Sequence, residues 1–140
     1  MSAALVAALE AEHAAIYAYG PIGVRLAGGQ AAAARAAEAA HRDRRDRLVL
    51  LLTAQGTPAP DRAAAYALPF PVTDAAAALK LAVQIEERTG AAWRVALPGL
   101  TGDQRRTALA GLTDCAVRAT RWRRAAGVSP ATVPFPGRLS

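Results

Sequence analysis

Glycine and proline divide this alanine-rich chain into long uninterrupted stretches. Breakers stand at Gly28-Gly29, Gly56, Pro98-Gly99 and Gly127, and the stretches between them contain no strand-like alternation of useful length. Glycine and proline end helices because glycine is conformationally free and proline lacks the backbone N–H that a helix interior needs. The sequence therefore predicts an all-α protein with four long helices.

Caps and breakers place the limits of these helices. The first runs to about Ala27, with a kink or break at Gly20-Pro21; the second spans about Gln30 to Gln55; the third begins at a Thr73 cap before Asp74 and ends near Leu97; the fourth begins at a Thr101 cap and ends near Ala126. The tail from Val128 contains three further prolines. We expect it to lie extended along the helices.

Connection lengths predict the topology. Very short turns join the first helix to the second and the third to the fourth, so each pair should form an antiparallel hairpin. Residues 57–72 contain four prolines together with apolar side chains such as Leu68 and Phe70. Extended, about 16 residues reach roughly 50 Å, whereas a helix of about 25 residues is roughly 37 Å long. This connection can therefore cross the whole bundle, which is the ferritin-like arrangement of four helices.

Length and composition fit one domain, residues 1–140, with a core built mainly of alanine, leucine and valine: 53% of residues are hydrophobic and only 5% aromatic. The apolar opening carries Glu10, Glu12 and His13 without a basic leading segment, and no uncharged run approaches the roughly 18 residues of a membrane span. We expect a cytoplasmic protein. The single cysteine, Cys115, excludes an internal disulfide and is expected to be a small core residue.

The net charge of +6 raises the question of nucleic-acid or membrane binding. Arginines concentrate in residues 42–47 and 121–124, but Asp43 and Asp46 interrupt the first group, and helical spacing scatters its side chains around the rod. Lys80 is the only lysine among 17 basic residues, an imbalance that a GC-rich genome produces without selection for a ligand. The arginines are therefore interpreted as solvated helix faces, and neither nucleic acid nor membrane is expected as a partner.

Helical periodicity assigns two carboxylates to the core. The inward line of the first helix is Leu5, Leu9, Glu12, Ile16, Tyr19, Gly23 and Leu26, and that of the third is Leu79, Val83, Glu86, Gly90, Trp93 and Leu97. The corresponding line of the second helix is Ala34, Glu38, His41, Arg45, Leu48 and Leu52. The spacing of Glu38 and His41 puts both side chains on one helix face. A carboxylate and an imidazole one turn apart can bind the same ion, as in the four-helix carboxylate proteins that hold two irons or manganeses.

Three inward carboxylates would repel one another in a dry core, so a positive charge is expected among them. One candidate is a metal ion. The other is arginine: Arg45, one turn beyond His41, or Arg118, near the inner line of the fourth helix. The fourth helix has no glutamate or histidine, and Asp114 is predicted to lie on its polar face. One iron, manganese or zinc ion could be bound by Glu12, Glu38, His41 and Glu86, and a dinuclear site is not supported.

The chain resembles an uncharacterised actinobacterial family of ferritin-like proteins. The likeness spans nearly the whole chain and rests on residues 8–20 (ALEAEHAAIYAYG), residues 40–46 (AHRDRRD), the Gly56-Thr57-Pro58 stop and Glu86-Glu87. The resemblance implies a ferritin-like four-helix bundle, a homodimer and no established activity. By analogy with ferritin-like enzymes it also implies metal-binding positions at Glu12, Glu38, His41 and Glu86. The missing fourth-helix pair argues against oxygen activation.

Two classes of function follow. In the first, the protein is not an enzyme and has no cofactor; Arg45, Arg118 or His41 neutralises the core acids, and the bundle serves as a dimerising or partner-binding module. In the second, it binds one metal ion and has oxidoreductase chemistry.

Four large aromatic residues could line a ligand cavity, the core or an interface: Tyr17, Tyr19, Trp93 and Trp122.

Overall fold

A computed structural model describes residues 2–139 as an all-helical fold, in which no strand occurs among the described residues. The helices are α1 (Ser2–Val24), α2 (Gly28–Ala54), α3 (Ala75–Ala96) and α4 (Gly102–Ala125), with a short 3₁₀ turn, Leu97–Gly99, between α3 and α4. The four predicted helices are confirmed. α1 packs against both α2 and α3, and α3 also packs against α4.

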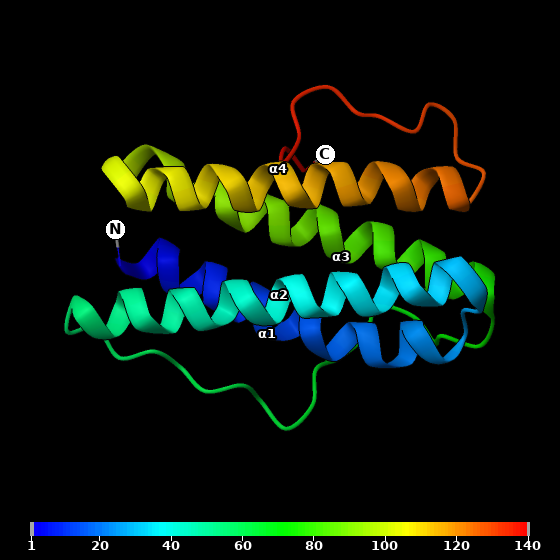
Figure 1. The fold of residues 1–140 in the computed structure, drawn as a ribbon, viewed down its shortest axis with the longest axis horizontal. Helices are drawn as coiled ribbons and strands as arrows, with labels where there is room; N and C mark the ends of the chain where they lie inside the picture. The colour runs from blue at the N-terminus through cyan, green and yellow to red at the C-terminus, as the bar shows by residue number, and fades with distance from the viewer. Residues whose placement is uncertain (1, 140) are drawn as a thin grey trace.

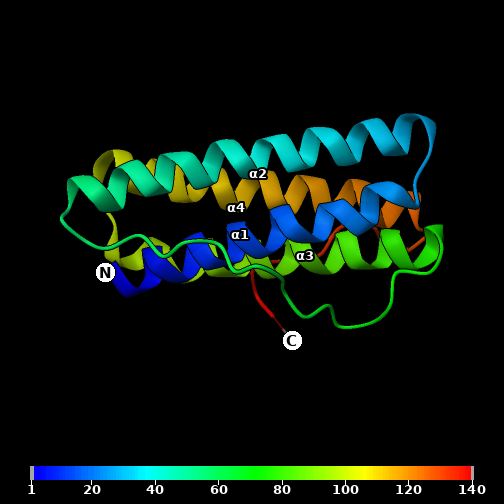
Figure 2. The same ribbon diagram turned by 90° about the horizontal axis from the view of Figure 1, so that it is seen from below.

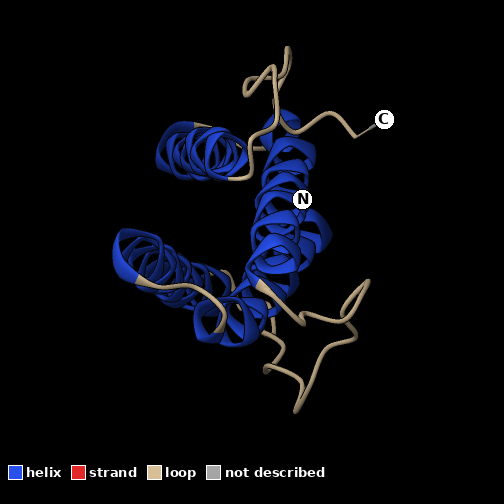
Figure 3. Ribbon diagram, turned by 90° about the vertical axis from the view of Figure 1, so that its right-hand side faces the viewer, coloured by secondary structure: helices blue, strands red, loops and turns tan. Residues whose placement is uncertain are grey.

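The crossover between α2 and α3 decides the directions of the helices. It runs the length of the bundle, so that α3 starts at the end where α2 also starts (Figure 1). α1 and α2 form one antiparallel hairpin and α3 and α4 form the other, whereas α2 and α3 run in the same direction (Figures 1 and 2). The crossover and the C-terminal tail lie on opposite sides of the helices (Figure 3). The predicted pair of hairpins with a long crossover matches this arrangement.

Several predicted boundaries differ by a few residues. α1 continues through Pro21 and ends at Val24, because Ile22, directly after the proline, is fully buried and this packing outweighs the helix-breaking preference. The third helix is capped by Asp74 and not by Thr73, since the Asp74 carboxylate accepts a hydrogen bond from the Ala77 N–H at 2.8 Å. Thr101 holds the expected N-cap position of α4, but its side chain makes no capping hydrogen bond.

The core consists of two apolar clusters placed one after the other along the bundle. One includes Ile22, Leu81 and Trp122, and the crossover residues Leu68, Phe70 and Val72 pack against it. The other includes Leu9, Leu48, Leu52, Trp93 and Leu100. The buried charged side chains of α1, α2 and α3 lie between these clusters. Apolar packing on both sides therefore isolates them from water.

The C-terminal tail is fastened to α3 and α4 by arginine side chains. Arg94 donates to the carbonyl oxygens of Phe135 and Pro136, both at 3.1 Å, and Arg123 donates to that of Ala131 at 3.1 Å. The tail thus lies along these helices, as predicted. Cys115 on α4 is a free cysteine and is buried, as expected of a core residue. Within residues 2–139, no helix is both long and apolar enough to cross a membrane.

Candidate functional site: a buried charge network

Three of the predicted site residues meet at the centre of the bundle. Glu12 comes from α1, His41 from α2 and Glu86 from α3, and none of them is more than 1% exposed. Each lies on the inward line of its helix, so the helical spacing of the apolar residues is what turns these polar side chains into the core. The structure brings these three residues together.

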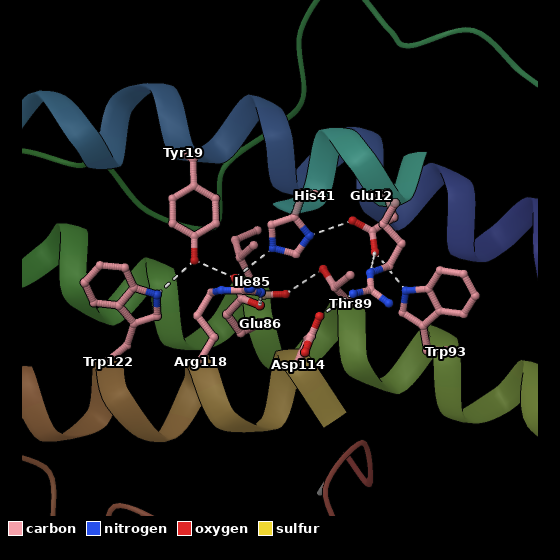
Figure 4. A network of polar contacts seen from close by, with 11 residues as sticks. Glu12, Tyr19, His41, Ile85, Glu86, Thr89, Trp93, Asp114, Arg118 and Trp122 are labelled. Atoms are coloured by element: carbon pink, nitrogen blue, oxygen red, sulfur yellow. Dashed lines mark hydrogen bonds and ion pairs between the residues drawn. The ribbon is translucent and has the colours of Figure 1, made fainter. Parts of the chain in front are cut away.

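His41 bridges the two carboxylates. Its Nδ1 lies 2.6 Å from Glu12 Oε2 and its Nε2 lies 2.8 Å from Glu86 Oε2 (Figure 4). A carboxylate oxygen only accepts, so both ring nitrogens must carry a hydrogen and donate it. His41 is therefore an imidazolium cation held between two carboxylate anions from two other helices.

The electrostatics of the site favour these charged forms. Burial alone would disfavour the imidazolium, but the Glu86 charge and the hydrogen bonds to Glu12 and Glu86 outweigh burial and raise the pKa of His41 from 6.5 to about 9. Burial would likewise raise the pKa of Glu86, yet the charges of His41 and Arg118 lower it below its usual value. At neutral pH, His41 is thus protonated and Glu86 ionised.

Aromatic side chains satisfy the remaining carboxylate oxygens. Trp93 Nε1 donates to Glu12 Oε1 at 2.8 Å, and the Tyr19 hydroxyl donates to Glu86 Oε2 at 2.5 Å. Trp122 Nε1 in turn donates to the Tyr19 oxygen at 2.9 Å. Burial and the nearby Glu86 charge hold the pKa of Tyr19 well above its ordinary value, so its hydroxyl stays a donor. These three aromatic residues are core residues that bound the network on both sides.

Two arginines complete the charge balance. Arg118 Nη1 donates to Glu86 Oε1 at 3.2 Å, and Arg44 Nε lies 4.0 Å from Glu12 Oε1. Arg44 also forms an ion pair with Asp114 of α4. The connected charges then comprise three cations and three anions: His41, Arg44 and Arg118 against Glu12, Glu86 and Asp114. The predicted neutralising role of Arg118 fits this geometry, and Asp114 is part of a salt bridge on an exposed position, as expected.

Two other predicted residues lie outside this network. Glu38 pairs with Arg42 on the same helix at 2.7 Å, and Arg45 pairs with Asp46 at 2.9 Å. At about 100° for each residue, Glu38 and Arg45 are turned from His41 by about 60° and about 40° to one side of α2. Arg44 is turned by about 60° to the opposite side. The first side faces the crossover and the second faces α4, so Arg44 takes the role that the sequence prediction gave to Arg45.

The donor atoms are not arranged as a metal site. Both nitrogens of His41 are engaged by carboxylates, and Glu38 points elsewhere. Among the residues that the structure describes, no group of three or more His, Cys, Asp and Glu side chains is placed to hold an ion. Cys115 lies near the network, and burial together with the charges of Glu86 and Glu12 raises the pKa of its thiol well above the ordinary value. It is therefore a neutral thiol and a poor ligand at neutral pH.

Sequence reasoning missed Arg44 and the indole donors. Trp93 follows Gly90 on the predicted inward line of α3, so it is expected in the core, but the sequence pattern names no hydrogen-bond acceptor for it. A buried indole N–H needs an acceptor, and the only strong acceptors predicted nearby were the inward glutamates. The Trp93 indole could therefore have been expected to donate to one of the two inward glutamates, and in the structure that residue is Glu12.

Comparison with known proteins gives a family but no activity. The family model described as "Domain of unknown function (DUF4439)" matches residues 4–140. A conserved hypothetical protein from Mycobacterium tuberculosis, rv2844, has 42% sequence identity to this chain, and its crystal structure superposes on this structure with a TM-score of 0.86. The match covers 89% of this chain and 95% of the mycobacterial one. None of the curated proteins compared with the chain matches it.

Proposed function

Because the chain belongs to the family described as a domain of unknown function (DUF4439), we propose its function from the geometry of the buried network. The protein is a ferritin-like four-helix bundle without catalytic activity, in which a Glu12–His41–Glu86 ion triad stands in place of a metal centre. It acts through its outer surface as a dimerising or partner-binding module. Similarity to the mycobacterial protein supports the expected actinobacterial lineage.

The observation that carries this proposal is the double engagement of His41. A metal ligand must offer a lone pair, and an imidazolium has none on either nitrogen. The cation that two buried carboxylates require is then supplied by the imidazolium itself, with Arg118 beside Glu86. Every carboxylate oxygen of Glu12 and Glu86 has a partner at 3.2 Å or less. Such a site is closed to further ligands and stabilises one packing of the helices.

The ferritin-like part of the proposal is supported by topology. The two antiparallel hairpins, the long crossover and the meeting of α1, α2 and α3 side chains at mid-bundle are the arrangement in which ferritin-like proteins hold their ligands. Fold alone does not carry function, so the proposal that the protein has no catalytic activity is supported by the triad and not by the topology.

The partner-binding part is supported by apolar side chains on the outer faces of different helices. Leu50 of α2 and Val95 of α3 are each 71% exposed, and Leu109 of α4 is 53% exposed. Sedimentation of the purified chain tests this part. We expect a homodimer of twice the 14.5 kDa chain mass. A monomer at every concentration up to several hundred micromolar would contradict the dimer.

Elemental analysis of protein purified without a histidine tag tests the rest of the proposal. We expect iron, manganese and zinc far below one ion for each chain, and no change in thermal stability when any of them is added. One bound metal ion for each chain that is lost in His41→Ala but kept in the outward control Glu38→Ala would contradict the ion triad and indicate a mononuclear metal site. Loss in both variants would support the four-ligand site expected from the sequence.

A further inference from the structure

A polar pocket lies between α1, α2 and the crossover, apart from the buried triad. It has a volume of about 380 Å³, and its polar lining comes from all three segments: His13 and Tyr17 from α1, Arg45 from α2, and Arg62 and Tyr66 from the crossover. Pockets of about 300–1,000 Å³ accept small organic ligands, whereas one water takes about 30 Å³ in the liquid. The space is therefore larger than a solvent site.

His13 leaves a polar atom unused in this pocket. Its side chain is 7% exposed, and Nε2 donates to the Pro60 carbonyl oxygen at 3.0 Å. Nδ1 has no hydrogen-bond partner, and it is the one such buried side-chain nitrogen or oxygen among the described residues. Leaving a buried polar atom unpaired costs about 1–3 kcal/mol, so this atom calls for a partner that the chain does not supply.

The charged lining of the pocket has one sign. Arg62 makes no hydrogen bond or ion pair with any residue that the structure describes. Arg45 uses its Nε on Asp46, and its terminal nitrogens make no hydrogen bond with any residue that the structure describes. No aspartate or glutamate lines the pocket. The unpaired Arg62 and the terminal nitrogens of Arg45, with no acid in the lining, create a positive potential that attracts an anion.

Two phenols add further donors and an apolar wall. The Tyr17 and Tyr66 rings contact each other with centroids 5.6 Å apart. The Tyr66 oxygen accepts from the Ala63 N–H at 2.9 Å, so its own hydrogen remains to be donated. The pocket therefore combines guanidinium and hydroxyl donors with aromatic surface.

We propose that this pocket binds a small organic oxyanion, with Arg62 and Arg45 on the anionic group and the tyrosine rings against the organic part. Guanidinium groups recognise both phosphate and carboxylate by paired N–H donors, so these two are the candidate head groups. Because Nε2 of His13 donates to Pro60, its Nδ1 is an acceptor that can take a hydrogen from a hydroxyl group of the same ligand. This site is separate from the ion triad and holds whether or not the triad replaces a metal.

Isothermal titration with phenyl phosphate and with benzoate tests the proposal, at ionic strength matched with chloride. We expect at least one of them to bind, and Arg62→Gln to weaken it by tenfold or more. Arg35→Gln is the matched control, because Arg35 is an exposed arginine of α2 that lies outside the pocket and has no described partner. Arg35→Gln should leave the affinity unchanged.

The two probes also separate the head groups. Tighter binding of phenyl phosphate assigns a phosphate ester, and tighter binding of benzoate assigns a carboxylate. The proposal is overturned if neither probe binds beyond the chloride background, or if Arg62→Gln and Arg35→Gln weaken binding equally. Because Arg62 is an exposed crossover residue without described contacts, Arg62→Gln is expected to fold as the wild type does.

Discussion

Replacing His41 should remove the cation on which two fully buried carboxylates depend. In His41→Gln, the neutral amide carries no positive charge and cannot replace both hydrogen bonds that the imidazolium donates to Glu12 and Glu86. The two carboxylates then face each other, and the nearest positive charge is that of Arg118. Removing one partner of a buried ion pair typically costs about 3–5 kcal/mol, since the other charge stays buried without compensation. We expect a loss of that size in the free energy of unfolding at pH 6.

The pH dependence gives an independent magnitude. His41 has a pKa of 6.5 in its ordinary state and about 9 in the folded protein. The difference of about 2.5 corresponds to about 3 kcal/mol, at about 1.36 kcal/mol for each pKa unit. Because the folded value is the higher one, this stabilisation is fully present below pH 6.5 and is lost as the pH rises through 9.

Urea unfolding of wild type and His41→Gln at intervals from pH 6 to pH 9 measures both effects. The wild type should lose about 3 kcal/mol relative to the variant over this range. Comparing the two proteins at each pH cancels the contribution of Cys115, whose raised thiol pKa also weakens the fold in alkali. A constant difference across the range, or a variant within about 1 kcal/mol of wild type at pH 6, would show that His41 is not the cation that balances Glu12 and Glu86.

Two further pairs of substitutions test neighbouring parts of the structure by urea unfolding. Arg118→Met should lower the free energy of unfolding by about 1–2 kcal/mol because it removes a hydrogen bond to a buried carboxylate. Arg45→Met, which removes only a surface ion pair, should lower it by less than about 0.5 kcal/mol. Equal costs would contradict the placement of Arg118 in the network and of Arg45 outside it. Gly111→Ala would place its Cβ 2.9 Å from the Trp93 ring and should destabilise by about 1–3 kcal/mol. Gly20→Ala, with no heavy atom within 4 Å of the new Cβ, should stabilise the fold by about 0.5–1 kcal/mol. A gain in stability in both glycine variants would show that α4 is not packed against the Trp93 indole.

The helices and the inward acids could be predicted because both follow from local patterns. Breakers bracket each helix, and a period near 3.6 residues fixes which side chains face inward, so Glu12, His41 and Glu86 were found without tertiary information. Proline at position 21 was overvalued as a break, because burial of the following Ile22 is a tertiary effect.

The choice between neighbouring arginines could not be made from the sequence. Arg44 and Arg45 both lie within about 60° of His41 on α2, one on each side. Which side faces an acid depends on where α4 packs, and that is set by contacts far apart in the chain. The same limit applies to Glu38, whose spacing from His41 fits a shared ligand role, because only the packing of α2 decides that Glu38 lies away from Glu12 and Glu86 and pairs with Arg42 of its own helix.

The protonation state of His41 decides between the ion triad and a histidine that is free to bind a metal. Nitrogen-15 NMR of the histidine side chains distinguishes an imidazolium, with hydrogens on both nitrogens, from a neutral ring with one hydrogen. At pH 7.5 we expect the His41 signal to be that of the doubly protonated ring, and to titrate with a pKa of about 9. A neutral His41 ring at pH 7.5, with a free lone pair toward Glu12 or Glu86, would contradict the ion triad and restore His41 as a metal ligand.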